Sequence, residues 1–259
     1  MAYYQQIYFD EIDLTQITGV KITKVITDRP PSVIISSGKI TRKDGIIIHN
    51  RELGAKKINI MGMITRPDRE QYLVARSELL KYLNKRTKVL QVPRDSQPTE
   101  YTATMSNVIF SDVGGGFANF DIEFTCSDPY GYERDTVYLL EAHTVTATSE
   151  DITLSEAIRG DTDSPGVIRV AIQSVTDPTS KTIEIISQAG ENISITRNWE
   201  AGEVLEIDML NKTVKVNGIL TDYTGVYWDF KPDDLNFTYS DDFTTREVDI
   251  TAYYRPRVL

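Results

Sequence analysis

The segment Phe120-Asp121-Ile122-Glu123-Phe124-Thr125-Cys126 alternates apolar and polar side chains without a break. Successive side chains of a β-strand point to opposite faces of the sheet, so this segment predicts a strand with one buried face and one solvated face. Cys126 lies on the apolar side and is the only cysteine of the chain. We therefore interpret it as a small buried hydrophobe, and an internal disulfide or a cysteine-based zinc site is excluded.

The residues before this strand predict further strands and one helix. Strands are expected at residues 57–64, 101–110 and 117–126. Thr65-Arg66-Pro67-Asp68 is typical of a helix start, with Thr65 as the capping residue. Apolar side chains then recur at helical spacing, at Tyr72, Ala75, Leu79 and Leu83. We expect this stripe to pack on the core and the helix to end near Asn84.

A hairpin arm is predicted within residues 39–56. Asp44-Gly45 is a two-residue turn signal, and an isoleucine run with basic neighbours follows it. An exposed arm of this kind would be an aggregation risk in a monomer. The run is therefore expected to pack either on its own core or on a neighbouring subunit, and the sequence leaves both open. In the second case the candidate interface residues are Arg42, Lys43, Ile46, Ile47, Ile48 and Arg51.

The second half of the chain predicts only β-structure. Short strands are expected at residues 167–172, 182–186, 192–196, 204–207, 213–216, 226–230 and 246–254. Asn217-Gly218 is a strong two-residue hairpin turn. Regular strands separated by turns indicate a sandwich rather than a parallel sheet. We therefore predict a mainly β protein, with an α+β N-terminal domain holding one helix (residues 1–140) and a C-terminal β-sandwich (residues 141–259).

The charge distribution argues against a nucleic-acid binder. The net charge is −10, with 18 basic and 17 acidic residues in positions 1–140 and 10 basic and 21 acidic residues in positions 141–259. Proteins that hold nucleic acid concentrate Lys and Arg to neutralise phosphates, and neither half does so. No stretch reaches the roughly 18 apolar residues of a membrane helix. The N-terminus lacks a signal-peptide pattern, so we expect folding in the cytoplasm and no membrane association.

No catalytic, metal or cofactor motif stands out. His49 and His143 fall in different predicted domains and have no ligands at metal spacing. Residues 161–166 resemble the opening of a calcium loop, but Pro165 and Ile172 occupy ligand positions. The many acidic residues of the second half show no pattern that selects a catalytic pair, and no Gly-x-Ser-x-Gly elbow occurs. We expect no enzyme activity, no metal and no cofactor.

The two tryptophans permit one binding hypothesis. Trp199 and Trp228 both fall in the predicted sandwich. A β-sandwich can bind sugars by stacking them on an exposed indole ring, whereas most such residues lie in a core. Sugar binding through Trp199 or Trp228 is therefore kept as an alternative, and it requires one of them to be exposed.

Three parts of the sequence resemble one known family. They are Phe124-Thr125-Cys126-Ser127-Asp128-Pro129-Tyr130-Gly131-Tyr132, then Gly202-Glu203-Val204-Leu205-Glu206-Ile207-Asp208 with Val214-Lys215-Val216-Asn217-Gly218 and Trp228, and finally residues 248–256. In this order they resemble the distal tail (Dit) proteins of siphophages, also called siphovirus-type tail components. The resemblance covers nearly the whole chain. Residues 231–236 depart from it, because the family tends to carry a Leu and a Pro-Gly-x-Asn turn there.

The resemblance implies a structural role at the distal end of a long, non-contractile tail. The N-terminal domains would form a hexameric ring, alone or as two stacked rings, with galectin-like sandwiches outside it. The ring would join the tail tube protein to the tail-tip hub or tail-associated lysin protein, and receptor-binding or accessory tail proteins would dock on it. DNA would pass through without specific binding. Assembly would take place in the cytoplasm of the host bacterium.

The sequence leaves three competing functions open. A carbohydrate-binding host-adhesion module of a phage tail would need an exposed tryptophan. A wall-degrading tail enzyme would need a carboxylate that the sequence does not nominate. A tail-tube subunit would stack into long tubes, and such subunits usually lack an attached sandwich of this size.

Overall fold

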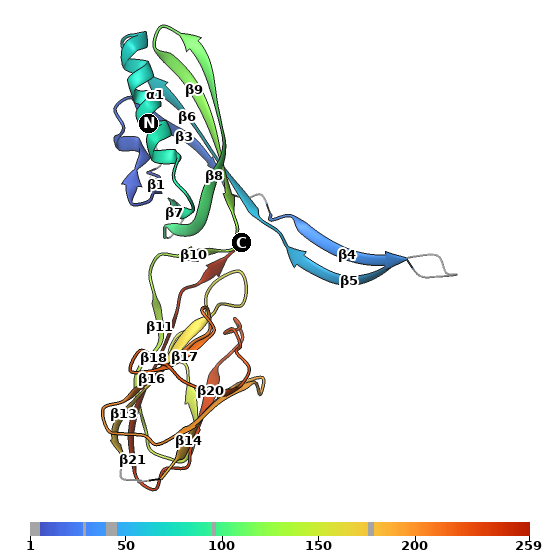
Figure 1. Ribbon diagram of the computed structural model, residues 1–259, viewed down its shortest axis with the longest axis vertical. Coiled ribbons are helices and arrows are strands. Elements are labelled where there is room, and N and C mark those ends of the chain that lie inside the picture. Colours follow the sequence, from blue (N-terminus) through green and yellow to red (C-terminus); the bar gives the residue numbers. More distant parts are fainter. Residues whose placement is uncertain (1–5, 28–29, 40–45, 95–96, 176–178) are drawn as a thin grey trace. The chain divides into compact units, whose positions relative to one another are not determined.

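The computed structural model describes residues 6–27, 30–39, 46–94, 97–175 and 179–259. The chain divides into two compact units, residues 1–134 together with Leu259, and residues 135–258. Strands dominate both units, and the single α-helix of the described residues lies in the first (Figure 1). The prediction of a mainly β protein with one helix in its N-terminal part is confirmed. The boundary expected between residues 140 and 141 falls inside a strand, and the units divide earlier, between Arg134 and Asp135.

The first unit is built on one antiparallel sheet. Its strand order is β2-β1-β7-β8-β9-β6-β3, and β10 adds to β8. The bounds are β1 Tyr8–Phe9, β2 Ile12–Asp13, β3 Val20–Ile26, β6 Lys56–Thr65, β7 Lys88–Val92, β8 Thr99–Gly114, β9 Phe117–Cys126 and β10 Gly131–Glu133, with a 3₁₀ turn at Leu14–Gln16. A second, two-stranded sheet consists of β4 Val33–Lys39 and β5 Ile46–Leu53.

Strand β9 lies in the middle of the large sheet, and its apolar face forms the centre of the core. It pairs with β6 and β8, so that Ile122 lies between Ile60 and Val108. Every second residue of β9 is buried, as its alternation predicts. The ring of Phe124 packs at 5.1 Å from that of Phe9. Cys126 is fully buried as expected, and this burial raises the pKa of its thiol to about 12.

Helix α1 (Arg69–Leu83) covers the core with the predicted stripe. Its buried residues are Tyr72, Ala75, Leu79 and Leu83, and Asn84 caps its C-terminus. The N-cap is Asp68, whose carboxylate accepts a hydrogen bond from the Gln71 backbone N–H at 2.8 Å. The expectation that Thr65 caps the helix is wrong, because Thr65 is the last residue of β6 and pairs with Phe117.

The second unit is a β-sandwich in which two antiparallel sheets enclose one hydrophobic core. The six-stranded sheet has the order β11-β21-β13-β16-β17-β18 and the five-stranded sheet the order β12-β20-β14-β15-β19. The bounds are β11 Val137–Val145, β12 Ser149–Thr153, β13 Gly166–Val175, β14 Lys181–Ser187, β15 Asn192–Arg197, β16 Val204–Asp208, β17 Thr213–Val216, β18 Ile219–Leu220, β19 Thr224–Gly225, β20 Asn236–Asp241 and β21 Arg246–Tyr254, and β22 spans Arg257–Val258.

One predicted strand of this unit is absent, and one predicted turn is present. Residues 226–230 form a connection rather than a strand, since only Phe230 makes a β-bridge, to Ser164, and Trp228 and Phe230 bury their rings from this connection. A Cβ atom on Gly166 would lie 2.3 Å from the Phe230 ring, so the glycine makes room for this ring. The Asn217-Gly218 turn is confirmed by φ values of 51° and 80°, which the tight hairpin turn requires.

Candidate functional site

The β4–β5 arm (residues 33–39 and 46–53) is a two-stranded ribbon. Its strands pair from Val33 opposite Leu53 to Lys39 opposite Ile46, with one irregularity after Ser36. Within the part of the chain that the structure describes, neither strand joins another sheet. An isolated two-stranded hairpin is marginally stable in water unless something packs on it.

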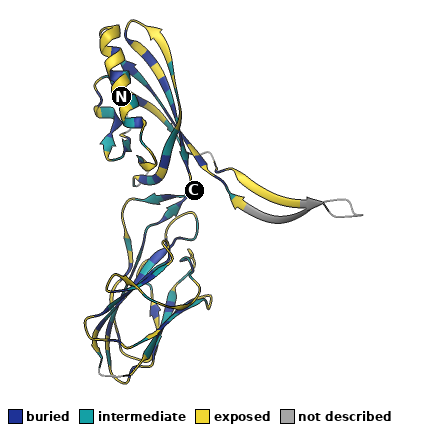
Figure 2. Ribbon diagram, in the orientation of Figure 1, coloured by how far each residue is buried: buried dark blue, intermediate teal, exposed yellow. Residues whose placement is uncertain are grey.

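The arm exposes apolar side chains on both of its faces. Val33, Ile34 and Ile35 have 44%, 56% and 53% of their surface exposed, and β4 is accordingly coloured as exposed in Figure 2. Neighbouring residues of a strand point to opposite faces, so Ile34 and Ile35 lie on different faces of the ribbon. An exposed apolar ribbon of this kind is a candidate surface for contact with another chain.

Four of the six predicted interface residues belong to this arm. Arg42 and Lys43 lie outside the described residues. Ile46, Ile47, Ile48 and Arg51 belong to β5, where the backbone pairing is described and the side chains are not. Sequence reasoning missed the apolar run of β4, although Val33-Ile34-Ile35 stands in the sequence as plainly as the run on β5.

The root of the arm is held by tight contacts at Gly54. The Gly54 N–H donates to the Ser32 carbonyl oxygen at 2.6 Å, and a Cβ atom on Gly54 would lie 2.3 Å from the Ser32 hydroxyl oxygen. Immediately beyond, Lys56 is 1% exposed and its ammonium lies 5.6 Å from the centre of the Tyr101 ring. The arm therefore starts from a well-packed position on the sheet.

The tryptophans proposed for sugar stacking lie in the sandwich core. Trp199 and Trp228 are only 4% and 6% exposed. The indole N–H of Trp199 donates to the Lys181 carbonyl oxygen at 2.9 Å, and the Arg197 guanidinium lies 5.2 Å from the centre of the Trp199 ring. A sugar platform needs an open ring face, and in this fold neither indole offers one.

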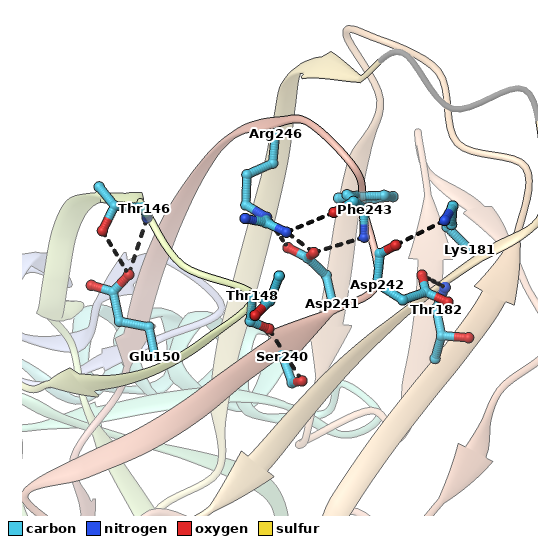
Figure 3. A network of polar contacts seen from close by, with 10 residues as sticks. All are labelled: Thr146, Thr148, Glu150, Lys181, Thr182, Ser240, Asp241, Asp242, Phe243 and Arg246. Atoms are coloured by element: carbon cyan, nitrogen blue, oxygen red, sulfur yellow. Dashed lines mark hydrogen bonds and ion pairs between the residues drawn. The ribbon is translucent and has the colours of Figure 1, made fainter.

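Two acidic residues at the connection between β20 and β21, Asp241 and Asp242, make hydrogen bonds that stabilise the sandwich. The Asp241 carboxylate is fully buried and accepts hydrogen bonds from the Arg246 Nε at 3.0 and 2.9 Å and from the Phe243 N–H at 2.9 Å (Figure 3). Asp242 points the other way and accepts from the Thr182 N–H at 2.7 Å. The two neighbouring carboxylates thus have separate structural roles and do not form a catalytic pair.

His143 contacts an acid without forming a metal site. Its Nε2 lies 2.6 Å from Glu150 Oε1. The Thr146 N–H, which donates to the same carboxylate at 3.1 Å, and then the His143 ring hold the pKa of Glu150 below its usual range. Within the described residues no three His, Cys, Asp or Glu side chains cluster as metal ligands. In the same part of the chain, no helix has the length and apolarity needed to cross a membrane.

Comparisons with known proteins agree on one family. The model of the phage tail protein RIFT-related domain matches residues 8–126, and that of the siphovirus-type tail component, C-terminal domain, matches residues 159–257. No curated protein matches the sequence. Among solved structures, the chain is similar to the Dit protein of phage SPP1, which is described as a paradigm of the hub adsorption apparatus in phages that infect Gram-positive bacteria.

The likeness to SPP1 Dit extends over the full chain. It covers 99% of this chain and 100% of the other, with a TM-score of 0.72 and 14% identity, and it shows a shared fold. Two structures of the phage P2 baseplate, in its activated conformation with Ca and with Sr, cover 96% of this chain at 9% and 11% identity. Their TM-scores of 0.46 and 0.43 are too low to establish a common fold. On the two successive family matches, which together cover most of the sequence, the chain belongs to the distal tail (Dit) family of structural siphophage tail components.

Proposed function

We propose that six copies of this chain form a ring through their N-terminal domains at the distal end of the phage tail. The observation that carries the proposal is the β4–β5 arm, whose apolar side chains are exposed on both faces. A ring closes when one surface of a subunit contacts a different surface of the next subunit. An arm that reaches the neighbouring subunit satisfies this geometry and covers its own apolar residues. The number six comes from the family resemblance.

The same ring would connect the tail tube protein to the tail-tip hub or tail-associated lysin protein. DNA would pass through its centre, and receptor-binding or accessory tail proteins would dock outside. The near balance of 18 basic and 17 acidic residues in positions 1–140 supports a passage that does not hold DNA, because net phosphate neutralisation would retain it. Assembly would take place in the cytoplasm of the bacterial host, as one ring or as two stacked rings.

The absolute mass of the purified protein tests the ring. Light scattering, with negative-stain imaging of the main peak, is expected to show a six-fold ring with an open centre. The double variant Ile34→Asp/Ile35→Asp places charge on both faces of the arm and is expected to yield folded monomers. Ile219→Asp is the matched control, because it makes the same change at a 74% exposed isoleucine of the sandwich. A wild-type monomer, or a ring that survives the double variant, contradicts the proposal.

The alternative of a carbohydrate-binding adhesion module receives no support from a specific observation. It relied on an exposed Trp199 or Trp228, and both are buried. Unchanged tryptophan fluorescence on addition of cell-wall polysaccharide is the expected outcome.

A further inference from the structure

The sandwich has two ends, and at each of them a short chain segment connects the edge strand of one sheet to the edge strand of the other. At the first end β11 of the six-stranded sheet leads into β12 of the five-stranded sheet. At the second end β18 leads into β19 in the same way. Strand edges carry unpaired backbone groups, and proteins usually protect them with charged or polar side chains. The two ends therefore offer a comparison within one domain.

The first end is protected. From His143 to Asp151 the exposed side chains are polar, apart from Ala147. The Thr146 N–H is capped by Glu150, as Figure 3 shows, and the Thr144 hydroxyl donates to Asp249 at 2.7 Å. At this end a carboxylate binds a backbone N–H and further charge lies beside the strand, which disfavours an added strand.

The second end is apolar. Ile219, Leu220, Tyr223 and Val226 are 74%, 67%, 40% and 57% exposed, and all lie within residues 219–226, where Asp222 and Thr224 are the exposed polar side chains. Leu210, in the turn that precedes β17, is also 52% exposed. Within the described residues, β18 and β19 are the last strands of their sheets. A gathering of apolar side chains at an open edge is the opposite of edge protection.

The pairing register leaves backbone groups of Leu220 directed outward. The Thr221 N–H donates to the Val214 carbonyl oxygen at 3.0 Å, and Val216 pairs with Ile219 across the Asn217-Gly218 turn. In antiparallel pairs, hydrogen-bonded positions alternate with non-hydrogen-bonded ones. Leu220, opposite Lys215, is therefore a non-hydrogen-bonded position, and its N–H and C=O point away from β17. These groups are placed to pair with one further strand.

Charge selects the kind of strand that fits. Residues 141–259 hold 10 basic and 21 acidic residues, so a second copy of this sandwich would be repelled and a basic segment attracted. We propose that the β18 edge binds an extended segment of another tail protein, with alternating apolar side chains and flanking Lys or Arg residues. Backbone hydrogen bonds to Leu220 would align the segment, and Ile219, Leu220 and Tyr223 would contact its apolar side chains. This proposal rests on the role in the tail proposed above and adds to it where an accessory partner docks.

Binding of a synthetic peptide to the full chain tests the edge. The probe is a fluorescently labelled peptide in which Val and Thr alternate, with Lys at both ends. Fluorescence anisotropy measures its affinity, and amide hydrogen exchange locates its site. We expect binding with protection confined to residues 218–226. A peptide of the same length with a central Pro, which cannot complete the pairing, and one with Glu at both ends are both expected to bind more weakly.

Two variants at one position separate backbone pairing from folding. Leu220→Pro removes the outward N–H together with the exposed leucine side chain and leaves the hydrogen bonds to β17 in place, and edge strands tolerate proline. Leu220→Asp places a negative charge beside the incoming strand. Each is expected to weaken binding about tenfold, the equivalent of one lost hydrogen bond or apolar contact. Leu235→Asp is the matched control, because it changes a leucine that is 68% exposed and lies outside both edges.

Three results would overturn the proposal. The first is equal binding of the basic, acidic and proline peptides. The second is peptide affinity that Leu220→Pro and Leu220→Asp leave unchanged while both variants retain the wild-type melting temperature. The third is self-association of the wild-type chain that Leu220→Asp abolishes, which would make a second copy the occupant. The ring proposal is tested by a separate measurement. The Ile34→Asp/Ile35→Asp variant of β4 is expected to change the mass of the assembly and to leave peptide binding unchanged.

Discussion

The Asp241 carboxylate has no exposed surface and lies against the Arg246 guanidinium, whose side chain is 12% exposed. Desolvating two charges is costly, and the pair is tolerable here because the carboxylate also accepts the Phe243 N–H and the guanidinium donates to the Phe243 carbonyl oxygen at 2.7 Å. Burial and, to a smaller extent, the Asp241 carboxylate raise the pKa of the Tyr239 hydroxyl. A single residue thus organises the connection between β20 and β21.

Replacing Asp241 by Ala is expected to destabilise the sandwich by about 3–5 kcal/mol, because it leaves the Arg246 charge buried without its partner. Urea unfolding followed by circular dichroism measures the change. Asp242→Ala is the control, since Asp242 is exposed and its loss removes one hydrogen bond from the Thr182 N–H, worth about 1 kcal/mol. Equal losses of unfolding free energy for the two variants would show that the buried Asp241–Arg246 pair contributes no more than one exposed hydrogen bond.

Glu150 makes stability depend on pH in a defined direction. Its folded-state pKa lies below the ordinary value of 4.5, so it stabilises the fold above that value and the contribution disappears as pH falls through the folded pKa. The melting temperature of Glu150→Gln is therefore expected to be lower than that of the wild type at neutral pH and to converge with it in acid. Glu156→Gln, which removes an exposed carboxylate, should show no such convergence. Parallel melting curves for both variants at all pH values would refute this linkage.

At the scale of elements, periodic segments were the predictable part of the fold. Strand β9 matched its predicted bounds, and α1 buried the four residues of its stripe, because one-sided burial requires a repeating apolar pattern. The same reasoning predicted a strand wrongly at residues 226–230. An apolar run whose rings are buried from a loop has the same sequence pattern as a strand. Short edge strands such as β18 and β19 carry too few residues to show any period.

The candidate surfaces were less predictable than the fold. The arm was recognised from its turn signal and isoleucine run, but β4 was not, because a ribbon exposed on both faces has no alternation to read. The tryptophans were ambiguous because burial of an indole depends on the whole core. The outward backbone groups of Leu220 depend on pairing register, and sequence reports register only where one face is buried.

The start of α1 gives a test of one wrong prediction. Asp68→Ala is expected to lower stability by about 1 kcal/mol, because it removes the acceptor for the Gln71 N–H. Thr65→Ala is the control, since Thr65 pairs within β6 and does not cap the helix. Thermal unfolding compares the two. A larger loss for Thr65→Ala would restore the cap predicted from sequence.

At the scale of the whole molecule, each unit has a hydrophobic core of its own. Chains with more than one core commonly depart from two-state unfolding. Calorimetry of the wild type is expected to show two transitions. Asp241→Ala should lower the temperature of one and Asp68→Ala that of the other. A single transition that both variants shift equally would show that the cores unfold together.

The root of the β4–β5 arm has a mechanical consequence. Only Gly54 and Ala55 separate β5 from β6, and every residue of β6 pairs with β9 while β3 pairs along its other side. Tension carried along β5 therefore enters the large sheet lengthwise through β6. Under this load the hydrogen bonds that β6 makes to β9 and β3 are sheared together and do not break one after another. In the ring proposed above, a tail pulled at one end would transmit force from subunit to subunit through this strand before the sheet yields.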